Sequence, residues 1–182
     1  MTQQIRLFFT GILALSAFFS NPGLASNDQL QTSAERIEEA KLLYRKAVPM
    51  ATDSKERQRM LDQAIAILKD VIANEPTSLD AHRKLMGAYL LKQDYHNSIR
   101  TIQDAINLSP EDPKLFITLA FLYEHSGALD FSSSMIEQAL KLDPDNKVAL
   151  DYKLVIQQKI QKMENSMSHH GSAMSPHSSA SQ

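Results

Sequence analysis

The sequence has no cysteine and no tryptophan, and only five of its 182 residues are glycine. Without cysteine the chain has no disulfide, no thiolate metal ligand and no thiol nucleophile. The scattered glycines form no glycine-rich phosphate-binding loop. The formal net charge is only −2, so the chain lacks the basic footprint of proteins that bind nucleic acid or anionic membranes. These absences exclude several common classes of enzyme and binding protein.

The first 25 residues differ in composition from the rest. Arg6 precedes an almost wholly apolar run over residues 7–19, and Gly23-Leu24-Ala25 places small residues at a cleavage site. This order is typical of a secretory signal peptide. A helix over that run would span only about 20 Å, too short for a membrane anchor. We expect cleavage after Ala25, a periplasmic or secreted mature chain without stable membrane insertion, and a short polar lead over residues 26–32.

The most informative pattern is an internal repeat with a period of 34 residues. Residues 79–112 and 113–146 carry the same apolar side chains at equivalent positions. The matched pairs include Leu85 and Leu119, Tyr89 and Tyr123, Ile102 and Ile136, Ala105 and Ala139, and Pro110 and Pro144. A fixed period of this length indicates stacked helical repeats, each of which covers its apolar face with its neighbours.

Two further helices are predicted before these copies. Thr32 and Glu35 have the spacing of a capping box, as do Asp53 and Glu56. The second of these helices keeps the period and the first does not, which is common in a terminal repeat.

Both regular copies resemble the tetratricopeptide repeat (TPR). The motifs that carry the resemblance are Ala81-x-x-x-Leu85-x-x-x-Tyr89, Leu119-Ala120-x-x-Tyr123 and Ala139-Leu140-x-Leu142-Asp143-Pro144. The copies depart from the family pattern in lacking Trp and in having Gln93 where Gly127 stands one period later. The resemblance implies an all-α fold, a short right-handed solenoid of antiparallel helix pairs. We assign a TPR domain to 33–164, with an irregular repeat (33–78), two TPRs (79–112 and 113–146) and a capping helix (147–164).

The capping helix is more apolar than closure of a stack requires. Leu150 and Leu154 are predicted to close it, and Tyr152, Val155 and Ile156 widen the apolar surface. That surface is either a thick cap or a patch that docks a partner or a second copy, so homo-oligomerisation stays open.

The tail, residues 165–182, is rich in Ser, His and Met and is predicted to be disordered. Imidazole and thioether groups together suit copper, and imidazole alone suits nickel or zinc. Weak copper or nickel binding is therefore an alternative function for the tail. Its candidate ligands are Met167, His169, His170, Met174 and His177.

No residue cluster points to catalysis. The sequence has no HExxH motif, and Ser126 beside His125 lies in a turn, where a hydroxyl usually satisfies backbone groups. We therefore predict a chain without enzymatic activity.

The TPR resemblance implies instead that the first helix of each pair lines a groove for another protein or a peptide segment. Leu90, Leu91 and Phe121 are expected to be exposed there as apolar anchors, with Arg83 or Lys84 receiving an acidic group. The full predicted groove comprises Arg83, Lys84, Gly87, Leu90, Leu91, Ile117, Thr118, Phe121, Glu124, His125, Tyr152 and Val155. The favoured function is a periplasmic adaptor or assembly factor, and the alternative is a metal-handling protein that uses the tail.

Overall fold

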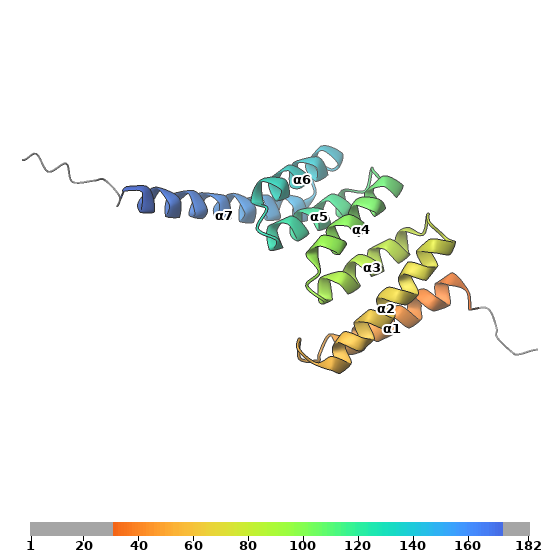
Figure 1. The fold of residues 1–182 in the computed structure, drawn as a ribbon. Coiled ribbons are helices and arrows are strands. Elements are labelled where there is room, and N and C mark those ends of the chain that lie inside the picture. The colour runs from red at the N-terminus through yellow and green to blue at the C-terminus, as the bar shows by residue number, and fades with distance from the viewer. Residues whose placement is uncertain (1–30, 173–182) are drawn as a thin grey trace, which may run out of the picture. The chain divides into compact units, whose positions relative to one another are not determined.

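The computed structural model describes the backbone of residues 31–172 and the side chains up to Met167 (Figure 1). All its helices belong to one compact unit that begins at Thr32. The helices are α1 (Ser33–Ala47), α2 (Lys55–Asn74), α3 (Leu79–Leu91), α4 (Tyr95–Leu108), α5 (Pro113–His125), α6 (Leu129–Leu142) and α7 (Lys147–Ser172). The described residues contain no strand. The predicted signal peptide lies outside the described residues, as does almost all of the polar lead.

The 34-residue period of the sequence is also the period of the helices. The helices α3, α5 and α7 begin 34 residues apart, and so do α4 and α6. Both copies pair a helix of 13 residues with one of 14 residues. The predicted repeats at 79–112 and 113–146 therefore correspond to α3–α4 and α5–α6, and α7 stands where the first helix of a further repeat would begin.

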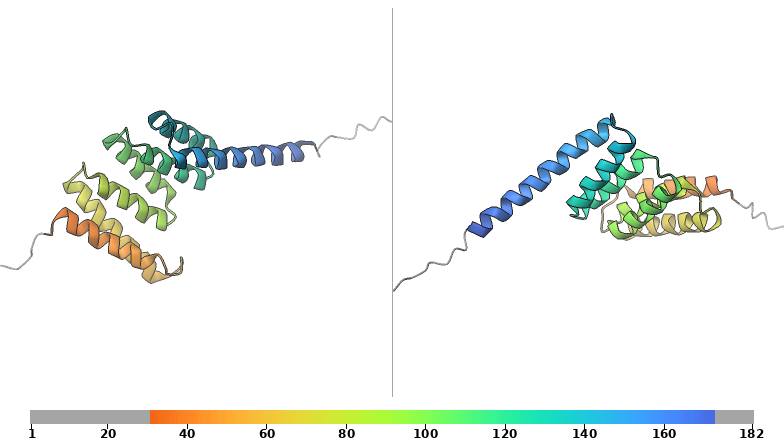
Figure 2. Two further views of the ribbon diagram at one scale, coloured as in Figure 1. Left: turned by 180° about the vertical axis from the view of Figure 1, so that it is seen from behind. Right: turned by 90° about the horizontal axis from the view of Figure 1, so that it is seen from above.

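Each helix packs mainly against its neighbours in the chain. Contacts link α1 to α2 and so on through α6 to α7, with additional contacts between α1 and α3 and between α5 and α7. Figure 2 shows the resulting succession of helix pairs from two further sides. This nearest-neighbour packing is what a repeat array requires, because each pair leaves an apolar face that only the next pair covers. The predicted all-α solenoid is confirmed.

Small buried side chains let the two helices of a pair approach closely. Ser98, Ser132, Ala105 and Ala139 are fully buried. The Ser132 hydroxyl donates to the carbonyl of Ala120 at 2.8 Å, across from α6 to α5. One period earlier, Ser98 Oγ lies 3.3 Å from the Met86 carbonyl, from α4 to α3. The repeat thus conserves a polar contact between helices as well as apolar packing.

The helix starts are close to those predicted. Thr32 and Glu35 form the expected capping box of α1. For α2 the predicted cap is wrong by one residue, because the capping residue is Ser54, whose side chain accepts a hydrogen bond from the amide of Arg57. This helix has 20 residues, and the loop before it is longer than the turns inside the regular pairs. The first repeat is irregular, as expected.

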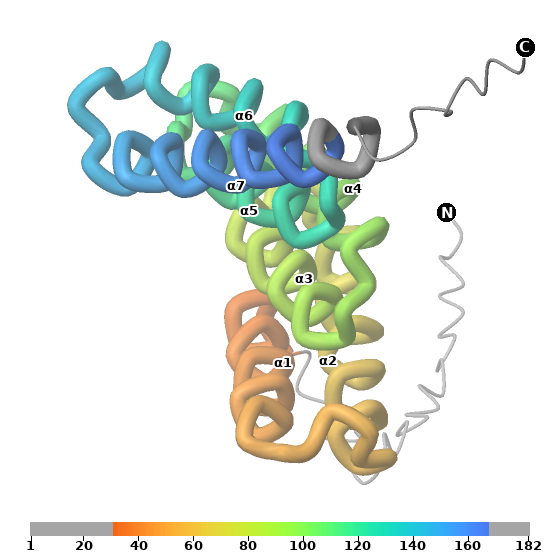
Figure 3. The backbone as a smooth tube through the Cα atoms, turned by 90° about the vertical axis from the view of Figure 1, so that its left-hand side faces the viewer, coloured from red at the N-terminus to blue at the C-terminus, as the bar shows by residue number. Residues whose placement is uncertain are grey.

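The last helix differs most from the prediction. It continues through Ser172, so the disorder predicted from residue 165 is wrong for 165–172. Its buried residues are Ala149 and Ile156, whereas Leu150 and Leu154 are 44% and 59% exposed. Leu150 and Leu154 therefore do not close the stack, because much of each side chain is exposed to solvent. The helix contacts α6 and, less extensively, α5; in the view of Figure 3 it passes in front of both, and Figure 1 shows its C-terminal part extending beyond them.

None of the described helices is long and apolar enough to cross a membrane.

Candidate functional site

The predicted groove residues all lie on the first helices of the pairs, α3, α5 and α7, whose shared surface we call the helix-A face. Five come from α3: Arg83, Lys84, Gly87, Leu90 and Leu91. Five come from α5: Ile117, Thr118, Phe121, Glu124 and His125. The remaining two, Tyr152 and Val155, come from α7.

The two predicted cations of α3 are engaged within the chain. The Arg83 guanidinium forms an ion pair with Asp112, the capping residue of α5. Lys84 Nζ lies 3.5 Å from Asp80, one helical turn earlier. A partner carboxylate at either cation would have to compete with a carboxylate of the chain itself. The expected role of Arg83 and Lys84 as free anion receptors is therefore not supported by the geometry.

The apolar anchors are less exposed than the sequence predicts. Leu90 and Phe121 are half-buried and pack against the core formed by α4 and α5. Leu91 is half-buried as well, and its carbonyl accepts a hydrogen bond from Arg57 of α2 at 2.7 Å. Neighbouring helices cover part of this face, which a single-helix pattern cannot reveal. The α7 residue Val155 remains open, with 41% of its surface exposed.

The α5–α7 end of the helix-A face gathers the most residues. Glu124 lies at its centre with only 9% of its side chain exposed. Lys159 forms an ion pair with its carboxylate, the Tyr152 hydroxyl donates to it at 3.2 Å, and His125 Nδ1 lies 2.7 Å from Oε2. Three of these four residues were predicted. Lys159 was missed, although it lies seven residues after Tyr152 and therefore on the same side of α7.

Aromatic rings extend this cluster toward α4. The rings of Phe121 and His125 have centroids 3.9 Å apart, and the ring of Tyr95 is centred 6.3 Å from that of His125. His125 Nδ1 also lies 3.0 Å from the Phe121 carbonyl. With 39% of its side chain exposed, His125 presents a ring to solvent beside a buried charge network.

The charges of the cluster favour a structural contact between α5 and α7 over acid–base chemistry. Burial raises the pKa of Glu124, but Lys159, His125 and the Tyr152 hydroxyl outweigh it and leave that pKa below its ordinary value of 4.5. Burial, followed by the adjacent Glu124 charge, raises the pKa of Tyr152. At neutral pH the carboxylate is therefore charged and the phenol protonated, as a structural contact between α5 and α7 requires.

The described side chains form no group of three or more His, Cys, Asp or Glu that could hold a metal ion. Among the predicted tail ligands, Met167 is exposed on α7. The backbone at His169 and His170 continues the same helix. Met174 and His177 lie outside the described residues. Metal binding by the tail stays a prediction.

Solved structures with the same arrangement of helices identify the fold. The chain is similar to a thermophilic TPR protein from Thermus thermophilus, with a TM-score of 0.63 and 19% identity over 71% of this chain and 66% of that one. It is also similar to the second TPR domain of human RPAP3 in complex with an HSP70 peptide, with a TM-score of 0.53 and 20% identity over 69% of this chain and 98% of that one. This chain has the tetratricopeptide-repeat fold.

Comparison of sequences adds less about this TPR chain. No family model matches it. It is 25% identical over 128 residues to the human protein O-mannosyl-transferase TMTC1, a match that covers 63% of this chain but only 14% of that protein. It is 24% identical over 131 residues to the uncharacterised protein y4yS of Sinorhizobium fredii, covering 69% of this chain and 70% of that one. The chain thus spans a small part of the transferase, and the match carries no activity to it.

Proposed function

We propose that this TPR chain is a non-enzymatic protein-binding module that takes a segment of a partner polypeptide on its helix-A face. The observations that carry the proposal are the partly exposed rings of Phe121 and His125 on α5 and the exposed apolar side chain of Val155 on α7. Such side chains are frequent anchors of protein interfaces. TPR domains of RPAP3 that share the fold bind HSP90 and HSP70 peptides, which supports this class of function.

The α5–α7 end is a better anchor site than the α3 end. On α3 the cations are paired, and Gly87 offers no side chain where α5 carries Phe121. On α5 and α7 the aromatic pair lies beside Lys159 and Glu124, whose charges hold the two helices together. An apolar residue of the partner would contact a surface that the ion pair keeps rigid.

We further propose that the module acts outside the cytoplasm, as an adaptor or assembly factor. Support comes from the N-terminal sequence alone, with its charged start, short apolar run and small residues before Ser26.

Site-specific photo-crosslinking tests the binding proposal. A photoreactive residue at Thr118, half-exposed on the helix-A face, should capture a partner that the same residue at the exposed position of Glu137 on α6 does not. Phe121→Ala should abolish that crosslink, and so should Val155→Glu, which changes only an exposed position. Phe131→Ala is the matched control, because Phe131 is an exposed phenylalanine of α6.

Two results would refute the proposal. One is capture that survives both Phe121→Ala and Val155→Glu in proteins that keep the wild-type melting temperature. The other is equal loss of capture in Phe131→Ala, which would place the partner elsewhere.

The metal-handling alternative remains a proposal about the tail. Calorimetric titration with Cu(I), Cu(II) and Ni(II) should give heat in the wild type that is lost on combined replacement of the three tail histidines by Ala. Identical traces would eliminate it.

A further inference from the structure

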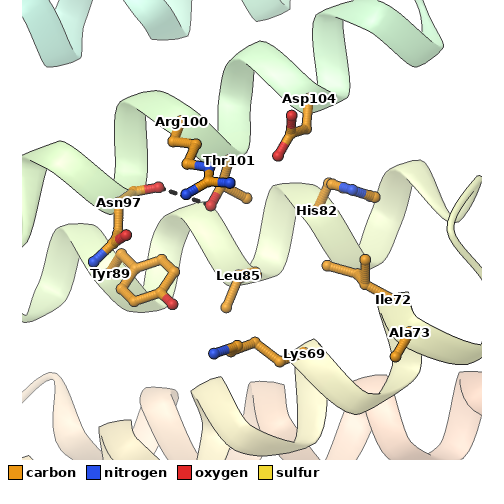
Figure 4. A pocket seen from close by; sticks show the side chains of 10 residues that line it. All are labelled: Lys69, Ile72, Ala73, His82, Leu85, Tyr89, Asn97, Arg100, Thr101 and Asp104. Carbon is orange, nitrogen blue, oxygen red and sulfur yellow. Dashed lines mark hydrogen bonds between the residues drawn. The ribbon is translucent and has the colours of Figure 1, made fainter.

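Two grooves lie on the surface formed by the second helices of the pairs, α2, α4 and α6, which we call the helix-B face. The first groove has a volume of about 420 Å³, with α3 as its floor and α2 and α4 as its walls (Figure 4). The second has a volume of about 480 Å³ and is lined by α4, α5 and α6. Arg100 and Asp104 of α4 border both.

The two grooves are the same structural feature one period apart. Apolar lining positions recur, with Leu85 and Ile72 in the first groove and Leu119 and Ile106 in the second. These residues belong to the repeat packing and occur in both copies for that reason.

The polar lining of the first groove does not recur. Lys69, His82 and Thr101 line it, and the residues 34 positions later are Gln103, Phe116 and Met135. The second groove is therefore built without a lysine, a histidine or a threonine at these places. Since the same helix arrangement forms with neutral residues there, packing does not require the polar groups of the first groove.

One end of the first groove presents hydrogen-bond donors. Lys69 projects from α2, Arg100 from α4 and Tyr89 from the last turn of α3 (Figure 4). The ion pairs found among the described side chains involve neither Lys69 nor Arg100, unlike Arg83 and Lys84. Burial raises the pKa of Tyr89, so its hydroxyl keeps its proton. Two cations and a phenol thus face a partly apolar floor.

The other end presents acceptors. His82 is only 6% exposed, and its Nδ1 lies 2.9 Å from the Ser78 carbonyl. In the neutral ring this contact puts the proton on Nδ1 and leaves Nε2 as an acceptor. The carboxylate of Asp104 lies at the same end (Figure 4).

The distance between the two ends suits a short extended peptide. Along α3, His82 and Tyr89 are seven residues apart, which corresponds to about 10 Å at the rise of an α-helix. An extended chain covers that length with about three residues. Its backbone amides would donate to the acceptor end, and an acidic side chain would reach the donor end.

We propose that the first groove binds an extended segment of a partner protein, with an acidic side chain at Lys69 and Arg100 and an apolar side chain over Leu85. This site lies apart from the helix-A face and shares no residue with the groove proposed there. The charge of Asp104 limits the acidic contact to one end and thereby sets the direction of the segment.

Fluorescence anisotropy with defined peptides tests the proposal. The probe is a fluorescein-labelled heptapeptide, amidated at its C-terminus, with a central Glu-Ser-Leu triplet and Ser elsewhere, because residues two apart in an extended chain point to the same side. It should bind the full chain at least about tenfold more tightly than the Gln-Ser-Leu version, because a charge-assisted hydrogen bond is worth about a tenfold change in affinity. Raising the salt concentration should weaken the acidic peptide selectively.

The second groove supplies the test substitutions. Lys69→Gln introduces the residue found at position 103, and His82→Phe the residue found at position 116, so both are compatible with this fold. Each should weaken binding of the acidic peptide about tenfold, and Arg100→Gln should do the same. Lys162→Gln removes an exposed cation of α7 and should have no effect.

Four outcomes would overturn the assignment. Equal affinity for the Glu and Gln peptides would contradict the proposed contact between an acidic side chain and the two cations. Absence of binding at millimolar peptide would contradict the site as a whole. Wild-type affinity in Lys69→Gln and Arg100→Gln would place any site elsewhere. The fourth outcome is binding that requires a free C-terminal carboxylate on the peptide. That result would show that Lys69 and Arg100 bind a chain terminus and not an acidic side chain.

A fifth variant separates this proposal from the function proposed above. Phe121→Ala should leave peptide affinity unchanged while abolishing the crosslink at Thr118. Loss of peptide binding in Phe121→Ala would assign the peptide to the helix-A face and contradict a separate groove.

Discussion

Single residues at the turns inside the two regular repeats adopt the left-handed backbone conformation. Gly127 has φ of 83° between α5 and α6, and Gln93 has φ of 61° at the equivalent turn between α3 and α4. Glycine adopts this left-handed conformation freely, whereas a residue with a side chain loses roughly 1 kcal/mol or more there. The sequence shows that one repeat has Gln93 where the other has Gly127. The backbone shows that this glutamine must adopt a positive φ, which costs free energy of folding.

Substitutions at these two equivalent turns should change the free energy of unfolding in opposite directions. We expect Gln93→Gly to raise the free energy of unfolding by about 1 kcal/mol and Gly127→Ala to lower it by about 1 kcal/mol. A Cβ at Gly127 would meet nothing within 4 Å, so only the backbone conformation is tested. Urea denaturation measures both changes, and the same sign for both variants would contradict this reasoning.

Glu124 gives the α5–α7 contact a pH dependence. Its pKa in the folded chain is lowered below 4.5, so its contribution to stability is complete above about pH 4.5 and is lost as the pH falls through the folded value. Glu124→Gln keeps the shape but not the charge, and should lower stability by about 1 kcal/mol at pH 7. Thermal melts from pH 7 to pH 3 should show the two proteins converging. A difference that is independent of pH would contradict the ion-pair role.

At the scale of helices, the closest contact within a pair depends on small residues. Ser132 of α6 is fully buried, and its hydroxyl bonds to a carbonyl of α5. Replacing it by Ala should cost about 1 kcal/mol, the value of one buried hydrogen bond. Ser132→Leu should cost about 3 kcal/mol, because extra carbon atoms force the two helices apart. Chemical denaturation distinguishes the two costs, and equal effects would show that the site has room for a large side chain.

The last helix shows why element ends are harder to predict than elements. Residues 165–172 include Asn, Ser, His and Gly, which are weak helix formers, so their composition indicates disorder. In the structure they continue a helix whose first half packs on α5 and α6. Extending an existing helix adds one hydrogen bond per residue, whereas starting a new helix is unfavourable. Tertiary packing of the first half therefore lengthens the helix beyond its sequence signal.

For the whole protein, the proposed export makes a direct prediction. Expressed in a bacterial host, the chain should be recovered from the periplasm with its first residue at Ser26, as measured by intact mass and N-terminal sequencing. Ala25→Arg should block this cleavage, because the peptidase reads a small residue there. A full-length cytoplasmic product from the wild-type gene would contradict the signal-peptide interpretation.

The sequence alone determined the fold of this protein. The recurrence of Leu85 and Leu119, or of Ala105 and Ala139, records which side of each helix must be covered, and that information is local and periodic. It also placed Phe121, Glu124, His125 and Tyr152 on one shared face, where the structure brings their side chains together, since these positions follow from helix periodicity. It overstated how open that face is, because the neighbouring helices that cover Leu90 and Phe121 are not part of any single helix pattern.

Only the tertiary structure decided which charges are satisfied and which are free. Arg83 reaches Asp112 and Lys159 reaches Glu124 across helices that are far apart in the chain, while Lys69 and Arg100 converge on a groove between α2 and α4. Such partnerships depend on how each helix is rotated and how close its neighbour lies. A one-dimensional pattern contains neither quantity, so packing was predictable and the pairing of polar side chains was not.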